Sequence, residues 1–166
     1  SDKGFSTFEF GNQNFAFPSL SENAKVYTSQ WGAYEDFAVE AKGINGSTLE
    51  GLRNTTERLI SSIDSLTKKV PDTLQTQSIV SRIMVTKTRA SLLHQEVNKA
   101  RLDSSRMQAH INEMNMATMN LIIQINEKFQ KDDIDFQRRD SEKQELEKQR
   151  TFLDSVYKSE LQDKKI

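Results

Sequence analysis

The stretch IVSRIMVTKTRASLLHQEVNKARLDSSRMQAHINEMNMATMNLIIQI, residues 79–125, decides the fold of this chain. Apolar or small residues recur through it at alternating steps of three and four, with no residue inserted or skipped. This spacing places them on one narrow face of a helix that packs against another helix. The face consists of Ile79, Ile83, Thr86, Ala90, Leu93, Val97, Ala100, Ser104, Met107, Ile111, Met114, Thr118, Leu121 and Ile125. Because a turn normally changes the register, we expect one long helix over about 73–131.

Two shorter helices are expected before Pro71. Ser19 precedes Glu22 by three residues, which is the spacing of a capping box at a helix start. Ser47 precedes Glu50 by the same interval. The expected helices span about 20–42 and about 48–69. Their apolar faces are Ala24, Tyr27, Trp31, Tyr34, Ala38 and Ala41 in the first, and Leu49, Leu52, Thr56, Leu59, Ile63, Leu66 and Val70 in the second.

The cluster Asp132–Asp135 is the expected turn after the long helix, because Asp favours helix caps over helix interiors. The charged residues that follow predict a fourth helix over about 135–163. We expect this helix to fold back on the second half of the long helix as an antiparallel coiled-coil hairpin. The first two helices would then pack on its first half. The alternative is a compact bundle in which the long helix breaks near Asp103.

The N-terminal segment is rich in Phe, Gly and Asn. Its aromatic residues are Phe5, Phe8, Phe10, Phe15 and Phe17. The sequence therefore predicts an all-α, elongated antiparallel bundle over about 19–166, preceded by an extended or hairpin-like Phe-rich arm over about 1–18. An isolated hairpin is marginally stable, so the arm needs a surface to lie on. These five side chains either cover this chain's own bundle or bind a partner protein, and we favour the partner because the helices already carry complete apolar faces.

Charge, cysteine content and motifs exclude several classes of function. Lys+Arg is 23 and Asp+Glu is 24, so the chain has no excess of basic residues for binding nucleic acid. There is no Cys, which excludes disulfides, thiol catalysis and thiolate metal sites. The phosphate-binding, dinucleotide-binding, zinc-protease and serine-hydrolase motifs are all missing. We therefore expect a non-enzymatic protein without a cofactor.

One cluster of Met and His residues has ligands that suit a soft metal such as Cu(I). Met107, His110 and Met114 lie close together on the expected long helix. Met107 and Met114 also belong to its apolar face, where Met commonly fills gaps in a core. We favour the core role and keep a helical metal sensor as an alternative.

The first four residues, Ser1-Asp2-Lys3-Gly4, resemble the start of a mature bacterial outer-membrane lipoprotein, just after its lipidated Cys. The resemblance implies a lipid anchor preceding Ser1 and a location in the cell envelope, facing the periplasm or the cell surface. It also implies a role as an accessory or scaffold subunit of an outer-membrane protein complex, docked through the Phe-rich arm. The alternatives are a periplasmic chaperone-like coiled-coil holder, the metal sensor, or a cytosolic coiled-coil adaptor if the resemblance is accidental.

Overall fold

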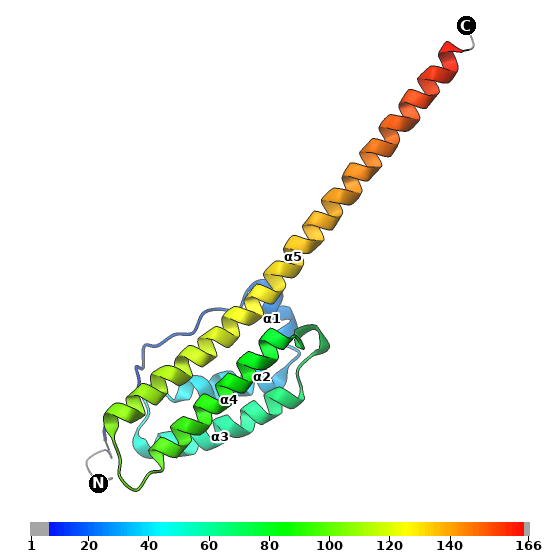
Figure 1. Cartoon of the computed structure of the whole chain (residues 1–166). Helices are drawn as coiled ribbons and strands as arrows, with labels where there is room; N and C mark the ends of the chain where they lie inside the picture. The colour runs from blue at the N-terminus through cyan, green and yellow to red at the C-terminus, as the bar shows by residue number, and fades with distance from the viewer. Residues whose placement is uncertain (1–6, 165–166) are drawn as a thin grey trace. The chain divides into compact units, whose positions relative to one another are not determined.

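A computed structural model describes residues 7–164 of the chain (Figure 1). The helices are α1 (Glu22–Thr28), α2 (Gly32–Gly43), α3 (Leu49–Lys68), the 3-10 helix η2 (Asp72–Leu74), α4 (Gln77–Val97) and α5 (Ser104–Asp163). The described range contains an isolated antiparallel bridge between Phe10 and Ser47 but no β-strand. The predicted all-α class is therefore confirmed. The chain divides into two compact units, Ser1–Lys128 and Phe129–Ile166, which are described separately.

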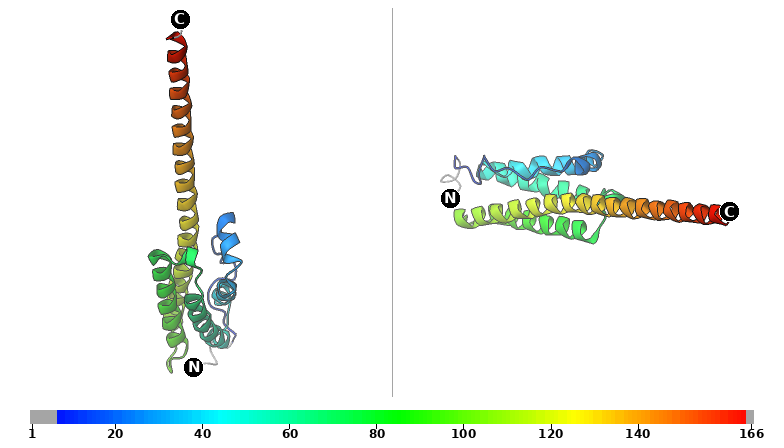
Figure 2. Two further views of the ribbon diagram at one scale, coloured as in Figure 1. Left: turned by 90° about the vertical axis from the view of Figure 1, so that its right-hand side faces the viewer. Right: turned by 90° about the horizontal axis from the view of Figure 1, so that it is seen from above.

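The core of the first unit lies between α2, α3, α4 and the part of α5 that precedes Phe129 (Figures 1 and 2). Helix α3 packs against both α2 and α4. Every residue of the face predicted over 79–125 is buried except Ala100 and Ser104. Burying a Leu or Ile side chain stabilises a fold by about 1.5–3 kcal/mol, so this face supplies much of the stability of the unit.

The helix expected over about 20–42 is in fact two helices, α1 and α2, separated at Ser29–Trp31. The Ser29 hydroxyl donates a hydrogen bond to the Val26 carbonyl (2.8 Å), which offers that carbonyl a partner outside the helical ladder. The Trp31 side chain is only 2% exposed. The free energy gained by burying this large indole exceeds the free energy lost with one turn of helical hydrogen bonds. Ser21, not Ser19, caps α1, because its Oγ accepts from the Ala24 amide (3.2 Å).

Helix α3 spans Leu49–Lys68, as the sequence predicts, but its cap differs by one residue. Thr48 Oγ1 accepts from the Gly51 amide (3.2 Å). Ser47 instead pairs through its backbone with Phe10. Local capping rules therefore found the start of the helix, while tertiary pairing decided which hydroxyl caps it.

The prediction of one long helix over about 73–131 is wrong. Helix α4 ends at Val97, a loop covers residues 98–103, and α5 begins at Ser104. Asp103 Oδ1 accepts from the Arg106 amide (3.2 Å) and so caps α5. Val97 and Met107 are ten residues apart, which equals steps of three, four and three. The loop therefore leaves the alternating spacing of the apolar residues unchanged. The break that the alternative placed near Asp103 is therefore present.

The predicted turn at Asp132–Asp135 is also absent, because α5 continues to Asp163. The separate fourth helix over about 135–163, and with it the antiparallel hairpin, is therefore not formed. An Asp inside a helix costs only about 0.7 kcal/mol relative to Ala, and no Gly or Pro follows Pro71. Asp135 also lies 3.9 Å from the Arg138 guanidinium, one helical turn further on. The low cost of Asp, the absence of Gly and Pro and this ion pair together let the helix continue through the acidic cluster.

No helix in residues 7–164 combines the length and the apolar character that a membrane span requires.

Candidate functional site

The Phe-rich arm lies on the first unit and runs along α5 (Figure 1). Phe10 is 1% exposed. Its backbone N–H donates to the Ser47 carbonyl (2.8 Å), and its carbonyl accepts from the Gly46 amide (2.7 Å). Partner binding through the arm stays a prediction, but Phe10 itself is part of the core of the first unit. The sequence could not reveal this, because the space that receives the ring forms only when the helices pack.

The other aromatic residues of the arm differ in exposure. Phe8 is 55% exposed, with its ring edge-on to Phe10 at a centroid distance of 4.8 Å. Phe15 and Phe17 are half-buried and pair with each other at 5.1 Å. Phe5 lies outside the described residues. Phe8 is thus the ring of the described arm that is most accessible to another molecule.

Two amide side chains of α5 bind the backbone of the arm and of the residues that follow it. Gln108 Oε1 accepts from the Gly11 amide (3.1 Å). Asn126 Oδ1 accepts from the Ser21 amide (2.8 Å), and its Nδ2 donates to the Ser19 carbonyl (3.0 Å). Gln108 and Asn126 were not predicted as contacts of the arm, since the only signal in the sequence was their place beside the apolar face of the helix. These bonds make the arm a structural element of the first unit.

A cavity of about 380 Å³ lies where the arm, the turn between α2 and α3, and α5 meet. Asn45 and Asn115 exchange two amide hydrogen bonds there (2.9 and 2.8 Å). The complete lining is Gly11, Asn12, Phe15, Asn45, Gln108, Asn112, Asn115, Met116 and Met119. None of these side chains is charged at neutral pH, so the lining offers hydrogen bonds but no acid, base or nucleophile.

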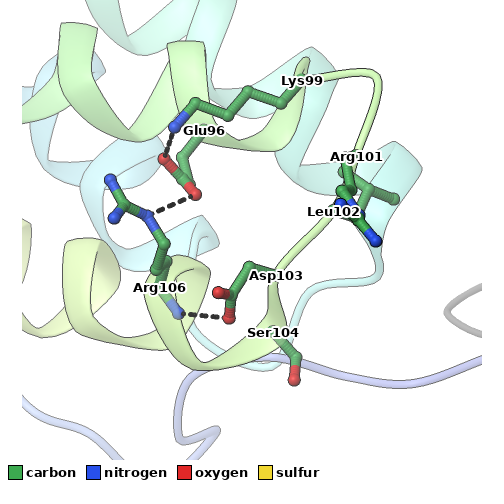
Figure 3. A pocket seen from close by; sticks show the side chains of 7 residues that line it. All are labelled: Glu96, Lys99, Arg101, Leu102, Asp103, Ser104 and Arg106. Atoms are coloured by element: carbon green, nitrogen blue, oxygen red, sulfur yellow. Dashed lines mark hydrogen bonds and ion pairs between the residues drawn. The ribbon is translucent and has the colours of Figure 1, made fainter.

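Glu96, at the end of α4, is the centre of an ion-pair cluster (Figure 3). Its side chain is 3% exposed. Lys99 Nζ lies 2.7 Å from Oε2, and Arg106 Nε lies 3.1 Å from Oε1. His110 Nε2 is 3.7 Å from Oε2. The hydrogen bond from Lys99, assisted by the one from Arg106, lowers the pKa of Glu96 against the opposing effect of burial.

A cavity of about 540 Å³ lies beside this cluster, at the loop between α4 and α5 (Figure 3). Both Glu96 oxygens are occupied by cations, and Asp103 is occupied as the cap of α5. The carboxylates of this cavity are therefore engaged in holding the two helices across the loop. We assign the cluster a structural role.

The three residues considered for a metal have different surroundings. Met107 and Met114 are fully buried in the core, as expected for residues of the apolar face. His110 is directed to the Glu96 carboxylate. Within residues 7–164 no group of three or more His, Cys, Asp or Glu side chains has the arrangement of a metal site.

The second unit presents apolar side chains to solvent. Every residue from 136 to 164 is exposed. Leu146 and Leu153 are seven residues apart and are 66% and 64% exposed. Val156 and Tyr157 follow Leu153 by three and four residues, so all four side chains lie on one side of the helix. Leu146, Leu153, Val156 and Tyr157 are called the C-terminal apolar face below.

The helix expected over about 135–163 was predicted to pack within the chain, against the second half of the long helix. The continuous helix α5 removes that partner, since no turn brings the segment back on itself. No family model, curated protein or solved structure matches the chain. The exposed face is therefore the feature of the described residues that most needs an explanation in terms of function.

Proposed function

We propose that this chain is a non-enzymatic scaffold or accessory subunit that docks onto a helical protein partner through the C-terminal apolar face. The observation that carries the proposal is that every residue from 136 to 164 is exposed, including large apolar side chains at helical spacing. Each Leu left in water forgoes about 1.5–3 kcal/mol of burial. A helix without tertiary packing is also marginal in water, so a partner would stabilise this segment.

The spacing of the face supports a helix as the partner. A narrow stripe with steps of three, four and seven fits between the side chains of another helix in knobs-into-holes packing. Residues 137–164 contain seven basic and seven acidic residues, counted directly in the sequence. Such a balanced segment has no net field that would attract a nucleic acid or any other strongly charged surface.

Two of the cavities of the first unit, the ones described above, offer groups for binding rather than for a reaction. One is lined by neutral amides, Phe15 and two Met side chains. In the other, the buried carboxylate of Glu96 is fully engaged by Lys99 and Arg106. Neither arrangement presents an activated nucleophile or a free general base.

The envelope location and the lipid anchor stay predictions, because Ser1–Gly4 lie outside the described residues. A codon for Cys directly before Ser1, preceded by an apolar signal segment, would support them. Fractionation of the natural protein is the direct measurement. Recovery in the membrane fraction after a salt wash is expected, and recovery in the soluble fraction would contradict the anchor.

Docking is tested by photo-crosslinking from single positions of the second unit. A photoreactive phenylalanine analogue replaces Tyr157, which belongs to the C-terminal apolar face, and in a matched variant replaces Ser155. Ser155 lies on the opposite side of the same helix and is equally available to solvent. The expected result, in the cells that make the protein, is a crosslinked protein from position 157 only. Equal yields at both positions, or no product at either, would contradict the proposal.

A further inference from the structure

The C-terminal apolar face has the heptad positions of a short coiled coil. Leu146 and Leu153 occupy successive a positions, and Gln149 and Val156 occupy the d positions between and after them. All four side chains are accessible in the described structure. We propose that residues 145–157 of two copies of this chain pair as a parallel, in-register coiled coil. This inference rests on the proposed docking function and names its partner.

The charges beside the row of a and d positions, called the seam below, favour a second copy in parallel orientation. Glu145 is at position g, and Arg150 is at the following position e. In a parallel pair, g of one helix faces the next e of the other, so Glu145 meets the Arg150 of the second copy in two symmetric ion pairs. An antiparallel pair brings e against e and places Arg150 opposite Arg150. Charge complementarity therefore selects the parallel arrangement.

Two aromatic residues also occupy a g position and the e position that follows it. Phe152 is at g and Tyr157 at the following e, and they are 67% and 62% exposed. Parallel pairing places the Phe152 of one copy beside the Tyr157 of the other, so that two large rings extend the apolar contact on each side of the seam. Phe152, which lies off the apolar face of a single helix, thus gains a partner in the dimer.

Gln149 gives the seam one polar layer. In a parallel, in-register pair each Gln149 faces its own copy, and two primary amides can donate to and accept from each other. The first unit contains such an exchange between Asn45 and Asn115, at 2.9 and 2.8 Å. A polar layer of this kind fixes the register of a coiled coil and lowers its stability.

The short seam implies a weak dimer. Two heptads bury far less surface than a stable interface, so we expect a dissociation constant on the order of 0.1 mM for the purified chain. Association of this strength becomes significant where copies are held close together, because tethering raises their effective concentration.

Disulfide crosslinking tests the proposal without background from other cysteines of residues 1–166, because these contain no Cys. The variant Gln149→Cys, made in the full chain at about 0.1 mM, is oxidised mildly and analysed on a non-reducing gel. A disulfide requires Cα atoms within about 7 Å, which the in-register d layer provides. We expect a covalent dimer from Gln149→Cys and at least tenfold less from the matched variant Ser155→Cys. Adding Leu153→Glu to Gln149→Cys should abolish the dimer.

Three outcomes would overturn the pairing. The first is equal dimer from Gln149→Cys and Ser155→Cys, which shows random collision. The second is a dimer from the double variant Leu146→Cys/Val156→Cys but not from Gln149→Cys, which shows an antiparallel pair. The third is no covalent dimer from any variant. If that third result accompanies a heterologous photo-crosslink from Tyr157, the second copy is wrong and the docking function stands; if both experiments fail, both proposals fail.

Discussion

Glu96 is the buried carboxylate on which the junction of α4 and α5 depends. The variant Glu96→Gln keeps the shape but removes the charge that engages Lys99 and Arg106. We expect the free energy of unfolding at pH 7 to fall by about 1–3 kcal/mol, the usual value of hydrogen bonds to a charged group. Urea unfolding followed by circular dichroism measures this. Glu113→Gln is the control, since Glu113 and its partner Arg89 are both well exposed and should matter by less than about 0.5 kcal/mol.

The effect of Glu96→Gln should depend on pH. The neighbouring cations hold the pKa of Glu96 below its ordinary value of 4.5. The ionised group therefore stabilises the fold above pH 4.5, and this stabilisation is lost as the pH falls through the lower, folded-state pKa. The difference in unfolding free energy between wild type and Glu96→Gln should shrink over that range. A difference that stays constant down to pH 2 would show that the charge of Glu96 does not matter.

Tyr34 gives a prediction for the stability of the fold at alkaline pH. Burial raises the pKa of Tyr34 from 10.0 to about 12. The unfolded chain therefore loses this proton before the folded chain does, and stability falls between pH 10 and pH 12 by about 2–3 kcal/mol. Tyr34→Phe should show a smaller decline than wild type in urea unfolding at several pH values. The same decline in both proteins would mean that other groups, such as lysines, account for it.

At the scale of elements, the arm is predicted to stabilise the first unit through Phe10. Phe10→Ala should lower the free energy of unfolding by about 3–4 kcal/mol, because it leaves a cavity in a packed core. Phe8→Ala is the matched control, since its ring is half exposed and its loss should cost about 1 kcal/mol or less. Thermal or urea denaturation of both variants measures the difference. Equal, small effects would return Phe10 to the role of an exposed docking residue.

The helix faces and the bounds of α3 could be read from the sequence, while the breaks after Thr28 and Val97 and the continuation of α5 could not. The buried positions of α3, such as Leu52 and Ile63, follow from spacing alone, because a helix that packs on one side must repeat its apolar residues. The loop after Val97 was hidden because it preserves that repeat. A charged helix over about 135–163 was expected, but the cluster at Asp132 suggested a turn before it and so a partner within the chain. Phe10 was unpredictable because its site exists only in the folded unit.

For the whole molecule, the two units should differ in stability. The first unit contains the buried core, whereas residues 136–164 of the second are exposed throughout. Deletion of residues 137–166 should therefore leave the melting temperature of the first unit unchanged within about 3 °C. Differential scanning calorimetry of the full and shortened chains measures this. A large drop in melting temperature would show that the second unit contributes to the fold of the first.

The central claim is that another helical chain covers the C-terminal apolar face when the protein acts. Maleimide labelling of single-cysteine variants measures this coverage directly, again without background from cysteines within residues 1–166. In dilute purified protein, Leu153→Cys and Ser155→Cys should react at similar rates, because both positions are exposed. In intact cells, the account predicts that Leu153→Cys reacts at least tenfold more slowly than Ser155→Cys. Equal labelling rates at the two positions in cells would contradict it.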